Sequence, residues 1–475
     1  MIILILILGL ILRLINLNQS LWLDEAISAF AARDFSYFGI AFDFFKIDNH
    51  PPLFYLLLKL WGQTFGFTDW ILRILPVALG VGIIYVVNKI TLKISDNSKL
   101  ALVTGIFTAT SPLFVYYSQE VRMYILIISL ASLQIWVFLE LLKREKKLGW
   151  TLFSLLNCLL FFSDYITIFF FPVFLLYPII KNDNKLLLKI LLSFIPLGIL
   201  FIFWLPIFNE QLIKNKEIVA SFPGWQFIVG GATFKNLAVT WMKFVVGRIS
   251  FEPKLIYYAL VGVGSIPIMI SLYLAFKQFK KYLIIWLWFI VPVTSGFLFS
   301  LIIPVFNYFR FIYVLPAFLI LISLGIFQIK KIVLRNLLVG LILLTNVIGL
   351  SIYYFDPAQS RENWRQVVDF LENNPAPSDL AVFEFYEPVA PFKWYSKKRI
   401  DAIGANDSYF ANKNKTNKKM EPALVGKTRV YHFEYLRDLT DPQRFVEEEL
   451  QSEGFREGQI FNNFYNIGQV SIWIR

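Results

Sequence analysis

Long apolar segments recur along the first three quarters of the chain, and short polar loops separate them. A helix of about 20 mostly apolar residues is long enough to cross a lipid bilayer. This criterion predicts about eleven membrane-spanning helices before residue 355. They are expected near residues 1–17, 70–92, 100–117, 123–142, 149–164, 165–181, 186–207, 255–276, 282–303, 305–328 and 333–354.

The pattern changes after residue 354. Short helical and strand periodicities alternate there, which is typical of a mixed α/β domain. The sequence therefore predicts a transmembrane domain at 1–354 and a small α/β domain at 355–475. Helices are expected at 364–373 and 442–452, strands at 380–386, 428–433 and 469–474, and a solvated loop at 412–419 (NKNKTNKK).

The composition agrees with a polytopic membrane protein. The chain is 57% hydrophobic and 16% charged, whereas soluble domains are about 45–50% apolar and about 25% charged. The net charge of +12 is unevenly distributed, because residues 355–475 hold 16 Lys and Arg against 18 Asp and Glu. The positive excess belongs to the membrane region, so no nucleic-acid partner is expected.

Basic residues cluster in alternate short loops, near residues 89–99, 143–147, 181–189, 277–281 and 330–335. Loops rich in Lys and Arg stay on the cytoplasmic side of a membrane. We therefore expect a plasma (inner) membrane protein with a cytoplasmic N-terminus. The loops at 18–69 and 208–254 and the domain at 355–475 are then extracytoplasmic.

The loop at 18–69 opens with two adjacent carboxylates, Asp24 and Glu25, in the stretch LWLDEAIS. Acidic side chains are costly near hydrocarbon and persist there where they do chemistry or bind ions. Neighbouring residues on a helix point in different directions, so one carboxylate should enter a site and the other support it. The alternative is that Asp24 only caps a helix over residues 26–33.

A second polar group, DNHPP, precedes an apolar helix within residues 48–61. Its two prolines favour a helix start, with Asn49 or His50 as the N-cap. The group is either a structural helix start at the membrane interface or a contact for a metal, a phosphate or a sugar. Asp48 and His50 are the candidate ligands of a divalent metal ion.

Arginines near the outer ends of the predicted spans form a third signal. In the turn before Tyr124, Glu120 lies where a helix N-terminus favours an anion. Arg122 can reach the surface, pair with Glu120 or bind a phosphate. With Arg310 and Arg13, three arginines surround the face that carries the two carboxylates. Such an arrangement suits the binding of an anionic lipid head group beside a general base.

These groups suit the transfer of a sugar from a polyprenyl phosphate. A carboxylate can remove the proton of the acceptor hydroxyl, and arginine or a divalent metal can stabilise the leaving phosphate. Abundant aromatic residues on the spans suit a long lipid. A single base without a carboxylate nucleophile predicts inversion, by analogy with glycosidases.

Four segments resemble the bacterial C-type glycosyltransferases, the relatives of protein O-mannosyltransferases and of the lipid A aminoarabinose transferase. They are LRLINLNQSLWLDEAIS, HPPLFYLLLKLW, YYSQEVRMY and FRFIYVLPAFLILIS. The likeness covers roughly residues 1–330, and the tryptophan–arginine pair at Trp364 and Arg365 adds to it. It implies the GT-C fold, an extracytoplasmic active site and a polyprenyl-phosphate sugar donor.

The resemblance also implies roles for single residues. Asp24 would be the catalytic acid/base and Glu25 its companion. Arg122 and Arg310 would contact the donor phosphate, with Arg13 as a further candidate. Some relatives have a glutamate that can help to hold a metal at the position where this chain has Asn49. The expected substrate cavity is lined by Tyr117, Glu120, Tyr124 and His50.

Two other functions compete with this enzyme. A transporter or lipid-glycan flippase would explain the many spans, but such proteins usually carry internal repeats and midplane ionisable residues, and neither is evident. A glycan ligase or polymerase of another membrane fold would not explain the DE and HPP motifs. The acceptor of the enzyme is expected to be a glycan, a lipid or a protein.

Overall fold

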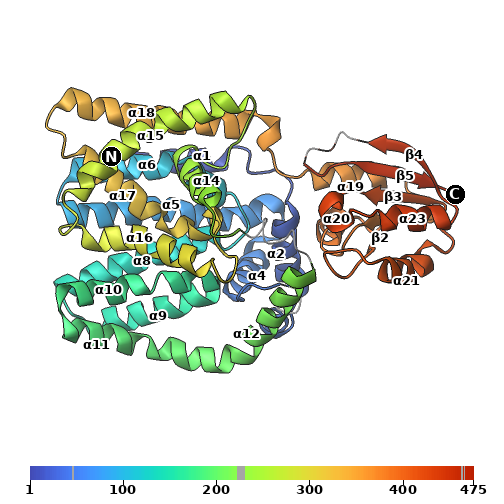
Figure 1. The fold of residues 1–475 in the computed structure, drawn as a ribbon, viewed down its shortest axis with the longest axis horizontal. Coiled ribbons are helices and arrows are strands. Elements are labelled where there is room, and N and C mark those ends of the chain that lie inside the picture. Colours follow the sequence, from blue (N-terminus) through green and yellow to red (C-terminus); the bar gives the residue numbers. More distant parts are fainter. Residues whose placement is uncertain (45–47, 222–229, 462–463, 465) are drawn as a thin grey trace.

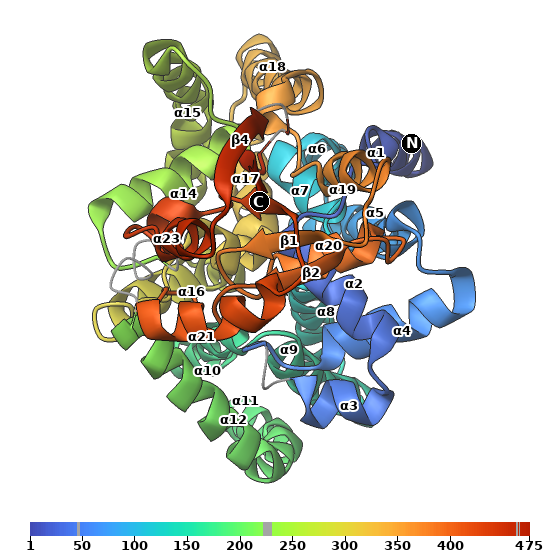
Figure 2. The same ribbon diagram turned by 90° about the vertical axis from the view of Figure 1, so that its right-hand side faces the viewer.

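The computed structural model describes residues 1–44, 48–221, 230–461, 464 and 466–475. A bundle of helices makes up most of the molecule, and a smaller α/β domain lies at one end of it (Figure 1). Seen from that end, the α/β domain covers the middle of the bundle (Figure 2).

The bundle contains apolar helices at all eleven predicted positions. Six are long and apolar enough to cross a membrane: Asp69–Ser95, Tyr124–Lys143, Asn184–Glu217, Lys254–Phe276, Tyr308–Ile326 and Ile332–Phe355. A pair of helices bent by 57°, Ser98–Thr110 and Pro112–Ser118, meets the same criterion when the two are taken together. The remaining four are shorter: Ile2–Leu14, Lys147–Ser163, Tyr165–Lys181 and Leu283–Phe299.

In the labels of Figure 1, the helices of the bundle are α1 (Ile2–Leu14), α5 (Asp69–Ser95), α6 (Ser98–Thr110), α7 (Pro112–Ser118), α8 (Tyr124–Lys143), α9 (Lys147–Ser163), η2 (Tyr165–Phe169), α10 (Pro172–Lys181), α11 (Asn184–Ser193), α12 (Ile195–Ser221), α14 (Phe234–Val246), α15 (Lys254–Phe276), α16 (Leu283–Phe299), η3 (Tyr308–Val314), α17 (Leu315–Ile326) and α18 (Ile332–Phe355). Three shorter helices follow α1: α2 (Leu23–Asp34), α3 (Tyr37–Phe42) and α4 (Leu53–Phe65).

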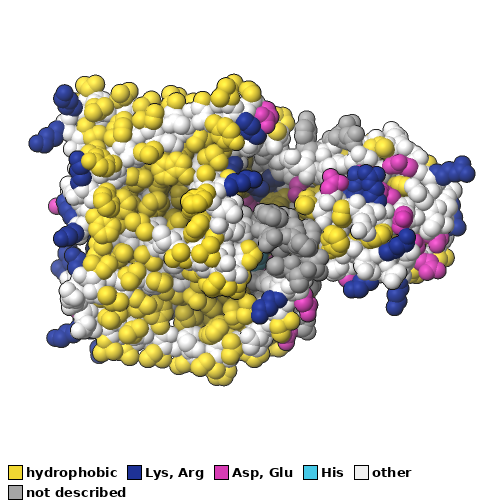
Figure 3. All heavy atoms as spheres, viewed as in Figure 1, with side chains coloured by type: hydrophobic (Ala, Val, Ile, Leu, Met, Phe, Trp, Pro, Cys, Tyr) yellow, Lys and Arg dark blue, Asp and Glu magenta, His cyan; other side chains and the backbone are white. Residues whose placement is uncertain are grey.

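The sides of the bundle are covered with hydrophobic side chains, and Lys and Arg gather at the end opposite the α/β domain (Figure 3). An apolar surface of this kind is stable against lipid and not against water. The protein is therefore a multi-pass membrane protein.

The C-terminal domain is built on a five-stranded sheet of order β2–β1–β3–β5–β4. The pairs of β1 with β2 and β3 are parallel, and the pairs of β5 with β3 and β4 are antiparallel. Its elements are η4 (Pro357–Gln359), α19 (Trp364–Glu372), β1 (Asp379–Phe383), α20 (Val389–Tyr395), β2 (Asp401–Gly404), α21 (Lys413–Leu424), β3 (Arg429–Phe433), α22 (Arg437–Thr440), α23 (Phe445–Ser452), β4 (Arg456–Phe461) and β5 (Val470–Ile474).

Successive residues of the central strands enter two different hydrophobic clusters. In β1, Ala381 and Phe383 belong to one cluster, and Leu380 and Val382 belong to the other. Side chains of a strand alternate between its faces, so both faces of the sheet are covered.

One prediction for this domain is wrong. Residues 412–419 are not a loop, because α21 begins there. The side chain of Asn412 caps this helix by accepting a hydrogen bond from the backbone N–H of Lys415. Thr416, Met420 and Leu424 are buried at helical spacing. The lysines between them lie on the solvated side and conceal this pattern.

The C-terminal domain is fixed to the bundle at Asp69, the first residue of α5. The Asp69 carboxylate accepts hydrogen bonds from Trp394 Nε1 at 2.9 Å and Tyr395 Oη at 2.6 Å, and it pairs with Arg365. Leu23 of α2 is part of the domain's hydrophobic core. These contacts hold the domain directly over the start of α2, where the two adjacent carboxylates lie.

Candidate active site

Asp24 and Glu25 both lie in the first turn of α2, where the helix dipole favours negative charge. The N-cap is Trp22, so the interpretation of Asp24 as a helix cap is wrong. The two carboxylates diverge, as their spacing predicts. Glu25 is fully buried, whereas the Asp24 side chain is 33% exposed.

Glu25 lies at the centre of a buried ion-pair network. Its carboxylate accepts a hydrogen bond at 3.0 Å from Arg73 Nε and one at 2.8 Å from the backbone N–H of Val121. Arg361 Nη1 lies 3.6 Å from Glu25 Oε2. Burial would raise the pKa of Glu25, but Arg361, Arg73 and the Val121 N–H together hold it below its ordinary value. Glu25 is therefore a permanent anion that positions α2.

Arg122 connects Asp24 to the polar group at residue 48. Its Nη2 atom lies 3.9 Å from Asp24 Oδ2, and its Nη1 atom lies 3.8 Å from Asp48 Oδ2. Nη1 also donates to Ser28 and Tyr55, each at 3.3 Å. Its Nε atom is buried and has no hydrogen-bond partner. The structure thus brings Arg122 beside Asp24, with one donor free for a further group.

Asp48 organises the turn that precedes α4. Its Oδ1 atom accepts a hydrogen bond from the backbone N–H of His50 at 2.7 Å and lies 2.5 Å from His50 Nδ1. Its Oδ2 atom accepts from Tyr55 Oη at 2.9 Å. The N-cap of α4 is Pro52, so the prediction that Asn49 or His50 caps this helix is wrong. The Asp48 side chain stabilises the turn in their place.

Asp48 and His50 do not fit a resident divalent metal ion. Both carboxylate oxygens of Asp48 already accept hydrogen bonds, and one ring nitrogen of His50 is taken by Asp48. Arg122 Nη2 lies 3.4 Å from both ring nitrogens of His50, where its positive charge opposes a second cation. No step of the reaction below uses a metal.

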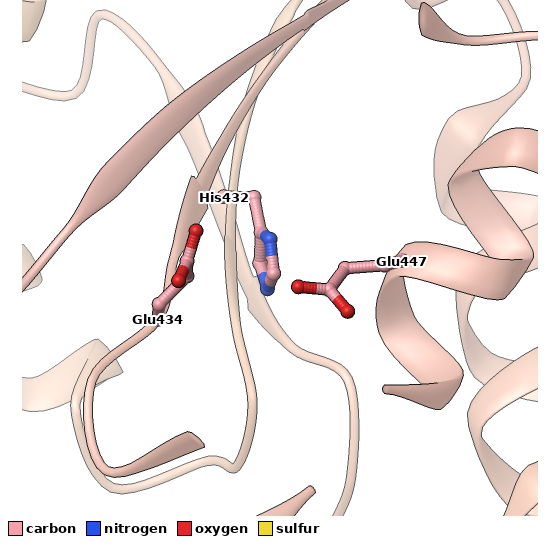
Figure 4. Close-up of side chains that lie close together, drawn as sticks. All are labelled: His432, Glu434 and Glu447. Atoms are coloured by element: carbon pink, nitrogen blue, oxygen red, sulfur yellow. The ribbon is translucent and has the colours of Figure 1, made fainter. Parts of the chain in front are cut away.

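Among the described residues, the one group of three potential metal ligands is His432, Glu434 and Glu447 in the C-terminal domain. Their ligand atoms lie within 4.8 Å of one another, with the His432 ring between the two carboxylates (Figure 4). Arg437 Nη1 bonds to Glu434 and lies 2.8 Å from Glu447 Oε1. This guanidinium already supplies the positive charge that the two carboxylates need.

Glu120 shares a guanidinium with Glu25. Arg361 Nη1 lies 3.7 Å from Glu120 Oε2, and both side chains are almost completely buried. The sequence suggested a pair between Glu120 and Arg122, but among the described residues Arg361 is its ion-pair partner. Burial raises the pKa of Glu120 to about 8. The charge of Arg361 acts against this rise, and the negative charge of Glu25 adds to it.

This pKa gives a testable pH dependence of stability. A carboxyl group that stays protonated in the fold and ionises in the unfolded chain stabilises the fold at low pH. We expect wild type and Glu120→Gln to be similarly stable below about pH 4.5. The wild type should then lose stability relative to the variant as the pH rises to about 8, and level off above it. Thermal unfolding in detergent across this range measures the difference.

The exposed Glu421 of α21 provides the matched control. Glu421→Gln removes the same charge at the surface and should show no comparable trend. A difference between wild type and Glu120→Gln that is constant from pH 4 to pH 9 would show that Glu120 is ionised throughout.

A series of aromatic rings leads from this network to Arg310. The ring centroids of Tyr117 and Tyr124 lie 5.0 Å apart, and those of Tyr124 and Phe309 lie 5.8 Å apart. The Arg310 guanidinium lies 5.9 Å from the Phe309 ring. Arg310 is half-buried, and no described carboxylate lies within ion-pair distance of it. It is available to an anion.

Arg13 is not part of this cluster. It is fully buried, and its guanidinium donates to Ser118 Oγ at 3.0 Å and to the carbonyl oxygens of Gly9 and Ala109 at 2.9 and 3.1 Å. These contacts join α1 to α6 and α7. The prediction that Arg13 binds the donor phosphate is therefore wrong, and Arg13 is a packing residue.

Sequence reasoning missed three residues that complete the site. Arg73 lies near the start of an apolar span, as Arg122 does, so the same signal could have found it. Arg361 precedes the tryptophan–arginine pair and was not singled out. Glu387 accepts a hydrogen bond from Tyr409, and burial raises its pKa to about 7, with a further rise from the charges of Asp24 and Asp48. Through Arg361 and Glu387 the C-terminal domain contributes to the site.

Comparisons with known proteins agree with the fold described above. A profile of the family described as dolichyl-phosphate-mannose-protein mannosyltransferase matches residues 49–208. Apo ArnT from Cupriavidus metallidurans superposes with a TM-score of 0.62 at 12% identity, covering 99% of this chain and 97% of that chain. The chain therefore has the fold of the GT-C glycosyltransferases. The predicted fold class is thereby confirmed.

Two further solved GT-C structures are similar to this one. ArnT from the same organism bound to undecaprenyl phosphate gives a TM-score of 0.60 at 12% identity, covering 99% and 97% of the two chains. The oligosaccharyltransferase AglB from Archaeoglobus fulgidus, with an inhibitory peptide and a dolichol-phosphate, gives 0.54 at 13% identity, covering 98% and 74%. A comparison with curated proteins gives no significant match.

Proposed function

We propose that this GT-C glycosyltransferase transfers a sugar from a polyprenyl-phosphate donor to an acceptor hydroxyl, with inversion, on the outer face of the plasma membrane. One observation carries the proposal. Among the four carboxylates closest to Arg122 and Arg361, Asp24 is the most exposed, at 33% against 0% for Glu25, 2% for Glu120 and 10% for Asp48. An accessible, charged carboxylate is what a general base requires.

The proposed reaction is a single displacement. Asp24 takes the proton of the acceptor hydroxyl while the oxygen of this hydroxyl attacks the anomeric carbon of the sugar. The bond between this carbon and the phosphate oxygen breaks, and its electron pair leaves with the phosphate, which gives free polyprenyl phosphate. One attack from the side opposite the leaving group inverts the anomeric configuration. The acceptor is a glycan, a lipid or a protein.

Arginine provides the charge that the leaving phosphate needs. Arg122 lies beside Asp24, and Arg310 has no ion-pair partner among the described residues. Guanidinium groups bind phosphate through strong, charge-assisted hydrogen bonds. The undecaprenyl phosphate and dolichol-phosphate bound in the similar solved structures support this donor class. The gathering of Lys and Arg at the far end of the bundle supports a cytoplasmic location for that end.

The donor class is tested by binding of undecaprenyl phosphate. We expect saturable binding to the purified protein in detergent, and Arg310→Gln should weaken it about tenfold, which corresponds to about 1.4 kcal/mol. Arg335→Gln is the matched control, because Arg335 is also half-buried and lies over a phenylalanine, Phe327, at 5.0 Å. If both variants lose affinity for undecaprenyl phosphate equally, the assignment of Arg310 to the donor phosphate is contradicted.

A further inference from the structure

The turn after α14 holds Arg248 in a fixed position. Gly247 has a φ of +84°, and a Cβ atom there would lie 2.6 Å from Pro112 Cβ, so this backbone fits closely against α7. Lys243 Nζ donates to the carbonyl oxygens of Arg248 and Ile249 at 3.2 and 2.8 Å. The backbone of Arg248 is therefore held between two helices.

The side chain of Arg248 is exposed and lies over two aromatic rings. Its guanidinium carbon is 4.6 Å from the Tyr116 ring centroid and 6.0 Å from that of Trp22. The described part of the chain provides no carboxylate within ion-pair distance of it. Tyr116 Oη and Trp22 Nε1 are buried atoms without hydrogen-bond partners. Buried polar atoms without a hydrogen-bond partner are uncommon in native proteins, and a bound ligand is one explanation for them.

This group lies next to the proposed reaction centre. The Tyr116 ring also contacts the guanidinium of Arg361, at 4.7 Å, and Arg361 in turn pairs with Glu25. The Tyr116 and Tyr117 rings are 5.1 Å apart, so Tyr116 continues the aromatic series that ends at Arg310. The series thus has an unpaired arginine at each end, Arg248 at one and Arg310 at the other.

We propose that Arg248, Trp22 and Tyr116 form a second anion-binding subsite, which holds a phosphate or carboxylate group of the acceptor. The inference rests on the proposed function. A polyprenyl-phosphate sugar carries one phosphate group next to the sugar, and Arg310 lies where it is expected. A second unpaired guanidinium at the other end of the series therefore belongs to the other substrate. Trp22 Nε1 and Tyr116 Oη, the unpartnered polar atoms of the two rings that Arg248 contacts, are the further donors that we assign to the oxyanion.

The test uses small anions as probes on the full-length protein in detergent. The protein is first saturated with undecaprenyl phosphate and then titrated with inorganic phosphate or acetate, at an ionic strength held constant with chloride. Thermal unfolding is the readout, because an anion that binds only the folded state raises the unfolding temperature in a saturable way. We expect one of the two anions to do so, and its identity distinguishes a phosphate group from a carboxylate group on the acceptor.

Arg248→Gln should weaken this anion effect at least fivefold, and Arg248→Lys should retain part of it. Trp22→Phe keeps a ring but removes the Nε1 donor, so it should weaken the effect independently of Arg248. Lys235→Gln is the matched control, because Lys235 is an exposed cation on the first turn of α14. It should leave the anion effect unchanged.

Three results would overturn the subsite. They are the absence of any anion effect beyond chloride, an equal effect in wild type and Arg248→Gln, and loss of the effect on adding phosphatidylglycerol. The last would assign Arg248 to a bilayer headgroup. The same experiments also measure how far undecaprenyl phosphate alone raises the unfolding temperature. If it has no effect, the proposed donor is contradicted, but the effect of small anions on wild type and Arg248→Gln can still be compared.

Discussion

Replacing Asp24 with asparagine is expected to lower the rate of sugar transfer by about 10²–10⁴-fold, the usual contribution of a general base. An amide of the same shape cannot accept the proton of the acceptor hydroxyl. The fold should be unaffected, because the Asp24 side chain is partly exposed and its closest ion-pair atom, Arg122 Nη2, lies 3.9 Å away. The measurement is the amount of sugar transferred, together with the thermal unfolding of both proteins.

Asp34 at the end of the same helix is the control for this variant. It is also an exposed aspartate, and it pairs only with the adjacent Arg33. Asp34→Asn should leave both rate and stability unchanged. Full turnover by Asp24→Asn would remove Asp24 from the chemistry and contradict its assignment as the general base.

The second large effect concerns stability. Glu25→Ala is expected to destabilise the protein by about 3–5 kcal/mol, the usual result of removing one partner of a buried ion pair. Arg73 Nη2 lies 2.5 Å from Glu25 Oε2, and both side chains are buried. The variant leaves Arg73 with an uncompensated charge and frees the N–H of Val121. Chemical or thermal unfolding in detergent gives the loss of free energy.

An exposed ion pair of the same length provides the comparison. Lys93 Nζ lies 2.5 Å from Glu140 Oε1, but Glu140 is 55% exposed. Glu140→Ala should therefore cost no more than about 1 kcal/mol. Equal losses for Glu25→Ala and Glu140→Ala would show that the network around Glu25 does not hold α2 in place. Loss of activity without loss of stability in Glu25→Ala would give Glu25 a direct part in the reaction.

The positions of the eleven apolar segments were predictable because a run of apolar residues is visible in the sequence itself. Six of these segments, with one bent pair, are long and apolar enough to cross a bilayer. The divergence of Asp24 and Glu25 was predictable because adjacent positions on any helix point in different directions. Both inferences depend only on residues that are neighbours in the sequence, so they do not require the tertiary structure.

The choice among the arginines was not predictable in this way. Arg13 lies near the C-terminal end of one apolar segment, and Arg73 lies near the start of another. Only the packing of the helices places Arg13 against the carbonyl oxygens of Gly9 and Ala109 and Arg73 against Glu25. Arg361 reaches the same carboxylate from the other domain, so its role depends on how the C-terminal domain docks on α2.

In the C-terminal domain, three strands have clear apolar patterns and were predicted. The structure adds β2 and β4, whose residues are mostly exposed or half-buried, so they lack an apolar stripe. Their place at the two edges of the sheet explains this composition. Edge strands contact the rest of the domain on one side only, so fewer of their positions need apolar residues and the strand pattern is harder to detect in the sequence.

The central claim is that the protein releases free polyprenyl phosphate when it transfers a sugar with inversion. The most direct measurement supplies the purified wild-type protein with a panel of undecaprenyl-phosphate sugars and a mixture of cell-envelope acceptors. It then determines released undecaprenyl phosphate and the anomeric configuration of the product. We expect acceptor-dependent release with one donor and an inverted product. Binding of the donor without release, with any acceptor supplied, would contradict the account and favour a carrier of lipid-linked sugars.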